Sequence, residues 1–130
     1  MDGEAFDTAA LKGKVSLLVI WAGDAEHCLN AIKAGMDLAA NHKGVAIYSI
    51  NIDEKPDKTR IRNFLAKNKI SVKTALDENG VVVDKLELEG VPMTFLIDKS
   101  GTVRKAFLGD HNDFKMLVGK EIAALQAEKK

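Results

Sequence analysis

The chain has 130 residues, of which 46% are hydrophobic and 29% are charged, and this suits one folded domain over 1–130 with its own core. Its 19 Lys and Arg balance its 19 Asp and Glu, which argues against nucleic acid or an anionic membrane as the main partner, because both select basic surfaces. No apolar stretch is long enough to predict a membrane span.

The first ten residues are polar, and we expect them to be a flexible or truncated N-terminal segment. They show no apolar signal region, so two locations stay open. Either the protein is cytoplasmic, or it is exported and its signal is absent from this chain.

The first predicted element is a strand at 15–21, a nearly continuous apolar run of the kind found in central parallel strands. A helix follows, with Asp24 as its N-cap and Gly44 beyond its last turn. A second buried strand is expected at 45–52. The apolar stripe of the helix recurs at three-to-four residue spacing: Cys28, Ile32, Gly35/Met36 and Ala39/Ala40.

Pro56 is expected at the start of a second helix, where its missing N–H is harmless. Ile61, Phe64 and Leu65 give that helix an apolar face. A short strand at 70–76 comes next. The residues after it contain the turn signal Asp-Glu-Asn-Gly and then a segment, 81–88, for which a short helix and an irregular connection both stay open.

Two further strands are predicted at 91–97 and 102–108, joined by a hairpin turn of sequence Asp-Lys-Ser-Gly. Asp113 is expected to cap the last helix. The early alternation of strand and helix predicts parallel strands with right-handed crossovers, and the hairpin adds antiparallel ones. We therefore expect an α/β sandwich with a mixed sheet of about four to five strands. The buried face of the last helix is predicted to hold Phe114, Leu117/Val118, Ile122 and Leu125.

Three sequence motifs follow one another along the chain, and their order and spacing are informative. They are Gly-Lys-Val-x-Leu-Leu-Val-Ile-Trp-Ala at 13–22, Gly-Val-Pro-Met-Thr-Phe-Leu-Ile-Asp at 90–98 and Gly-Thr-Val at 101–103. Together with the insert at 52–88 they resemble the thioredoxin-like superfamily, and within it the TlpA/ResA-like branch of thiol-disulfide oxidoreductases. The resemblance covers 11–128. It implies a thioredoxin-like three-layer sandwich, a periplasmic or otherwise extracytoplasmic location, and no cofactor.

The resemblance also implies partners: protein or peptide thiols and disulfides as substrates, and a membrane reductase as electron donor. Cytochrome maturation and protein oxidation are the activities it suggests.

No metal is expected, because the three histidines, His27, His42 and His111, do not cluster with other ligands. A one-cysteine peroxidase is a weaker match, since the threonine and proline that usually precede such a cysteine are missing.

In the family pattern, Ala25 stands where the nucleophilic cysteine belongs and Cys28 is the resolving cysteine, with Glu26 and His27 between them. A histidine there favours the thiolate, whereas a glutamate disfavours it. The chain departs from the pattern at three more positions, which usually hold an aromatic residue, an acid and a kink proline. They are occupied by Asp24, Ala31 and Lys33.

Cys28 is the chain's single cysteine, so no internal disulfide can form. Disulfide exchange needs a thiolate to attack and a second thiol to resolve the mixed disulfide. We therefore predict that the chain, with Ala25 at this position and a single cysteine, is redox-inactive. Cys28 itself is either a small buried hydrophobe or a reactive lone thiol, and its exposure separates the two readings.

Two explanations of Ala25 stay open. A deliberate Cys-to-Ala substitution fits the retention of Cys28, which has no use alone. Natural divergence into a redox-inert module that binds peptides or a partner protein fits the other departures from the family pattern. Restoring the thiol would give Cys-Glu-His-Cys, a credible redox site.

Pro92 is the second notable residue. It either starts a strand, which requires no function, or is the cis proline that the resemblance implies, facing the tip of the first helix. In relatives, the backbone at the position of Val91 receives an extended substrate, a form of β-augmentation that needs no sulfur. The predicted substrate-binding residues are Trp21, Asp24, Val91 and Pro92.

Overall fold

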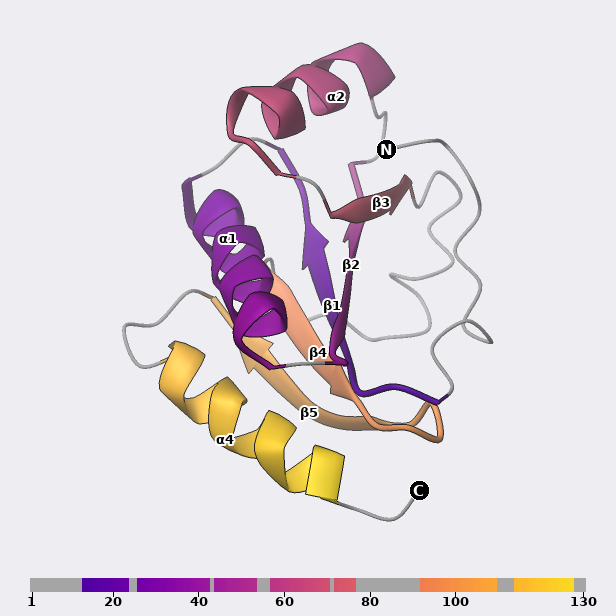
Figure 1. Ribbon diagram of the computed structural model, residues 1–130. Coiled ribbons are helices and arrows are strands. Elements are labelled where there is room, and N and C mark those ends of the chain that lie inside the picture. Colours follow the sequence, from indigo (N-terminus) through magenta and orange to yellow (C-terminus); the bar gives the residue numbers. More distant parts are fainter. Residues whose placement is uncertain are drawn as a thin grey trace.

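Five strands form one mixed sheet in the order β3-β2-β1-β4-β5 (Figure 1). The computed structural model describes residues 13–23, 26–42, 44–53, 57–70, 72–76, 92–109 and 114–127. Expectations about Asp24, Ala25, Val91, Asp113, the first ten residues and the segment after β3 lie outside these ranges. The strands are β1 (Ser16–Trp21), β2 (Ala46–Asn51), β3 (Lys73–Leu76), β4 (Met93–Ile97) and β5 (Val103–Leu108). The helices are α1 (Glu26–Asn41), α2 (Lys58–Lys67) and α4 (Phe114–Ala127).

The pairing of the strands confirms the predicted mixed sheet. β2 runs parallel to β1, and β3 runs parallel to β2. β4 is antiparallel to β1, and the hairpin strand β5 is antiparallel to β4. In this register Trp21 pairs with Asn51 and Ile20 pairs with Met93. The ends of β1 and β2 and the start of β4 therefore meet at one edge of the sheet.

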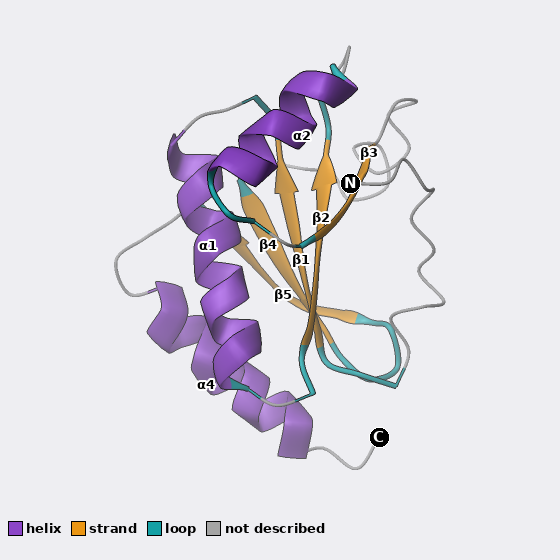
Figure 2. Cartoon of the chain, turned by 45° about the horizontal axis from the view of Figure 1, so that its top comes forward, coloured by secondary structure: helices purple, strands orange, loops and turns teal. Residues whose placement is uncertain are grey.

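The described helices pack against one face of this sheet (Figure 2). Alternate residues of β1 face opposite sides, as the pleat requires. Leu17 and Val19 contact the helices, whereas Leu18 and Ile20 join a second apolar cluster with β2 and β4 on the other face. Every residue of β1 is buried, which confirms it as the central strand.

Among the helices in the described ranges, none has the length and apolar character needed to span a bilayer.

The buried face of α1 differs in part from the prediction. Cys28, Ile32 and Gly35 are buried as expected, but Ala40 is exposed and Leu38 is buried instead. The reason is helical geometry, because two successive steps of three residues from Ile32 lead to Gly35 and then to Leu38. Gly35 allows a close approach to β2: a Cβ added there would lie 2.5 Å from Cδ1 of Ile47.

The start of α2 corrects a second prediction. Asp57 is the N-cap, with its Oδ1 accepting the Arg60 amide at 3.1 Å, so the helix begins two residues after Pro56 rather than at it. Ile61 and Leu65 are buried, and Phe64 is partly buried, as predicted.

In α4 the alternative Leu117/Val118 is resolved by burial. Val118 is fully buried together with Ile122, whereas Leu117 is 43% exposed. Leu125 is buried as well, so the predicted face is otherwise confirmed within the residues whose side chains are described. Phe114 begins α4, but its side chain lies outside that set.

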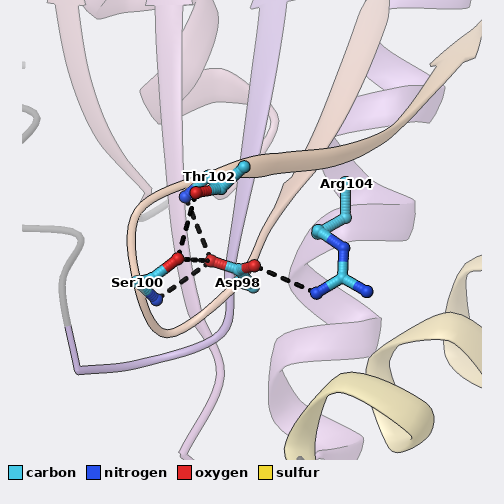
Figure 3. Close-up of polar contacts among 4 residues, drawn as sticks. All are labelled: Asp98, Ser100, Thr102 and Arg104. Atoms are coloured by element: carbon cyan, nitrogen blue, oxygen red, sulfur yellow. Dashed lines mark hydrogen bonds and ion pairs between the residues drawn. The ribbon is translucent and has the colours of Figure 1, made fainter.

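The hairpin between β4 and β5 is organised by one buried carboxylate (Figure 3). Asp98 Oδ1 accepts the Ser100 hydroxyl at 2.6 Å, the Ser100 amide at 2.9 Å and the Thr102 amide at 3.0 Å. Its Oδ2 accepts Arg104 Nη1 at 3.0 Å. These donors, the Ser100 hydroxyl first, hold the pKa of Asp98 well below the ordinary aspartate range, although burial opposes them.

Asp98→Asn is expected to lower the free energy of unfolding at neutral pH by about 1–2 kcal/mol, because the amide keeps one acceptor but turns an N–H donor toward Arg104. The native advantage is fully present above the unfolded pKa of about 3.9 and is lost as the pH falls through the lower folded value. Urea unfolding across this acid range should therefore show the two proteins converging. A constant gap would contradict the assignment. Arg104→Gln is the milder control, at less than about 1 kcal/mol, since the Arg104 side chain is 40% exposed.

Candidate functional site

The candidate site lies at the sheet edge where β1 and β2 end and β4 begins. Ala22 and Gly23 leave β1 at this edge, and α1 starts three residues later. Pro92 immediately precedes β4 and is buried, and its carbonyl accepts the Gly109 amide at 2.8 Å. That bond ties the proline to the end of β5. The fold thus brings the start of α1 and Pro92 to the same edge.

Several predicted site residues lie outside the described ranges. These are Asp24, Ala25 and Val91, so the contact between residue 25 and the proline loop stays a prediction, as does a cis bond before Pro92. Glu26 and His27 are described, and both are exposed in the first turn of α1.

Cys28 lies one turn into α1 and is only 2% exposed. Its thiol donates a hydrogen bond to the carbonyl oxygen of Ala22, with 3.4 Å between sulfur and oxygen. Apolar side chains from β1 and α2 share its cluster. This burial favours the reading of Cys28 as a small core residue over that of a reactive lone thiol.

Trp21 does not have the surface role expected from sequence. Its side chain is fully buried and stacks on Phe64, with 5.5 Å between ring centroids. Its Nε1 donates to Ser49 Oγ at 3.3 Å, and Ser49 in turn bonds Thr74 Oγ1 at 2.7 Å. A side chain without exposed surface cannot contact a substrate directly, so Trp21 supports the site from the core beneath it.

Asn51 and Asp53 are functional candidates that the sequence reasoning missed. Asp53 Oδ1 accepts the Gly23 amide at 2.7 Å, and Oδ2 accepts Asn51 Nδ2 at 3.0 Å. Asn51 Oδ1 accepts the Asp53 amide at 3.0 Å. The one available signal was the placement of two polar residues at the end of a strand, since Asn51 is the last residue of β2 and Asp53 follows it after Ile52. They fasten the turn after β1 to the end of β2.

Within the described ranges, no three His, Cys, Asp or Glu side chains come together in a group that could hold a metal ion. The chemistry the described site offers is therefore that of one buried thiol, two exposed polar side chains on the first turn of α1, and a proline at the start of β4.

Comparison with known proteins identifies a family model and relatives that are named for thiol–disulfide chemistry. The family model described as Redoxin matches residues 1–119. The thiol:disulfide interchange protein DsbE of Vibrio cholerae is 32% identical over 111 residues, covering 85% of this chain and 58% of that protein. The thiol-disulfide oxidoreductase ResA of Bacillus subtilis is 28% identical over 110 residues, covering 83% and 60%. The chain thus spans about three fifths of the length of these relatives.

Solved structures agree with the sequence matches. A candidate thiol:disulfide interchange protein DsbE from Chlorobium tepidum superposes with a TM-score of 0.80 at 25% identity, covering 90% of this chain and 83% of that one. A thiol-disulfide isomerase from Corynebacterium glutamicum gives a TM-score of 0.78 at 20% identity, covering 98% and 90%. The thioredoxin-like α/β fold that the sequence predicts is therefore confirmed.

Proposed function

The chain belongs to the Redoxin family, and on that premise we propose that it is a thiol-disulfide oxidoreductase relative that is redox-inactive as written. Its relatives named as interchange proteins and oxidoreductases make protein thiols or disulfides the natural substrate class. An extracytoplasmic location, a membrane reductase as electron donor and a role in cytochrome maturation belong to the same proposal.

The observation that carries the proposal is the state of the only thiol. Cys28 is the single cysteine of the chain, it is almost wholly buried, and its S–H group is engaged with the Ala22 carbonyl. Exchange begins with a thiolate that reaches a disulfide, and it ends with a second thiol that resolves the mixed disulfide. A shielded, hydrogen-bonded thiol serves the first step poorly, and no second cysteine exists for the last one.

Insulin reduction by dithiothreitol is the direct test. We expect the native chain to give the rate measured without protein, and Cys28→Ser to give the same rate, because the one thiol contributes nothing to turnover. Turnover clearly above that rate in the native chain, lost in Cys28→Ser, would show that Cys28 acts alone and would overturn the proposal. Circular dichroism of both proteins confirms that the comparison is between folded chains.

A second candidate function is a binding module for an extended peptide or a partner protein. It is favoured by the intact frame of the site, where Pro92 is held by Gly109 and the turn after β1 is held by Asp53. Neither bond involves sulfur, so a docking surface built on them does not depend on a thiol at position 25. The variant Ala25→Cys, considered below, separates this candidate from the first.

A further inference from the structure

The peptide unit between Ala22 and Gly23 is hydrogen-bonded at both its carbonyl oxygen and its N–H group. Its carbonyl oxygen accepts the Cys28 thiol at 3.4 Å, and its N–H group donates to Asp53 Oδ1 at 2.7 Å. One planar, conjugated group therefore connects the sulfur to a carboxylate. Hydrogen bonds arranged in such a chain polarise and strengthen one another.

We propose that Asp53 is a positioning residue for the site, holding the Ala22–Gly23 peptide so that Cys28 remains a hydrogen-bonded thiol. The inference deepens the proposed function and rests on it, since it supplies a cause for the proposed inertness of the only thiol. The negative carboxylate draws on the Gly23 N–H and makes the Ala22 oxygen a better acceptor for S–H. The same oxygen repels a thiolate, so loss of the proton is disfavoured.

Asp53 is well placed for this role because its own geometry is fixed. Its two carboxylate oxygens are bonded to different donors, and its amide is bonded to the side chain of Asn51, which is fully buried. Gly23 has φ of +65°, a left-handed conformation that glycine adopts without a steric penalty. The turn is thus built to present its N–H group to Asp53.

Apart from Cys28 itself, the charged and titratable residues of α1 and α2 lie at the surface. Glu26 and His27, the neighbours of Cys28 on α1, are exposed. From β1 the apolar cluster around Cys28 receives Val19 and Trp21, and from α2 it receives Ile61, Phe64 and Leu65. The charged residues of α2, which are Lys58, Arg60, Arg62 and Lys67, are exposed. Of the charged side chains named here, Asp53 is the one that bonds to the peptide accepting the thiol.

The test is the rate at which iodoacetamide alkylates Cys28 in the folded chain, measured from roughly pH 6 to 10, a range that brackets ordinary thiol ionisation. We expect Asp53→Asn to raise the rate at neutral pH by about threefold or more, with the midpoint of the pH profile moved to lower pH. A variant that only loosens the fold would raise the rate without that movement. An unmoved midpoint overturns the inference.

Asp98→Asn is the matched control, since it makes the same chemical change at the opposite edge of the sheet and is also expected to weaken the fold. It should leave the alkylation midpoint in place. If Asp53→Asn does not fold, Asp53→Ser takes its place, because it removes the charge and keeps a possible acceptor. Insulin reduction is run on the same proteins. Turnover by the native chain refutes the proposed function, on which the inference rests, whereas an unchanged midpoint with background turnover refutes only the role of Asp53.

Discussion

Ala25→Cys is expected to give a chain that catalyses thiol–disulfide exchange. The new thiol would stand immediately before α1, which begins at Glu26, and therefore at the positive end of the helix dipole, where a thiolate is favoured. It would also stand three residues before Cys28, which could then resolve the mixed disulfide. We expect insulin reduction about tenfold or more above the native rate, and a defined two-electron potential in glutathione buffers.

Two controls define what the gain means. Ala25→Ser adds a hydroxyl of similar size without sulfur and should stay at the background rate. Ala25→Cys combined with Cys28→Ser should trap a mixed disulfide with substrate but not turn over, because the resolving thiol is missing. If Ala25→Cys folds but forms no internal disulfide and stays at background, the site has degenerated too far for redox chemistry. That result would favour the peptide-binding or partner-binding module over the oxidoreductase proposal.

Much of the fold could be predicted because it depends on local patterns. The apolar run of β1 indicated a buried central strand, and Asp98 with Gly101 indicated the hairpin. The pattern left a choice open where either of two neighbours could face the core, as at Leu117 and Val118, since a helical step of 100° does not separate such pairs. Burial in α4 is decided by β1 and α1, which are distant in sequence.

The site was harder to predict than the fold, because its bonds join residues far apart in the chain. Cys28 and Pro92 were recognisable from motifs, but the bond from Gly23 to Asp53 spans 30 positions. The hydroxyl pair of Ser49 and Thr74 is equally nonlocal and depends on β2 and β3 lying side by side. A motif identifies the residues that carry chemistry, whereas the residues that hold them emerge only once the strands are paired.

Trp21→Ala is expected to cost about 3–5 kcal/mol of unfolding free energy, the range for removing a large aromatic side chain from a core. Trp21 is fully buried, joins β1 to α2 through Phe64, and packs in the same cluster as Cys28. Because most domains are stable by only about 5–15 kcal/mol, this single change removes a large share of the total. Urea unfolding followed by far-ultraviolet circular dichroism measures the loss without relying on the lost indole.

Trp21→Phe separates the packing of the ring from the indole hydrogen bond. It keeps an aromatic ring for Phe64 but removes the donor to Ser49, whose hydroxyl still has Thr74 as a partner. We therefore expect it to cost clearly less than Trp21→Ala, and a double-mutant cycle with Ser49→Ala to assign about 0.5–1.5 kcal/mol to the hydrogen bond.

A loss below about 1 kcal/mol in Trp21→Ala would mean that the core collapses around the missing ring. In that case Trp21 would not be the support on which the turn after β1, and with it Cys28, depends.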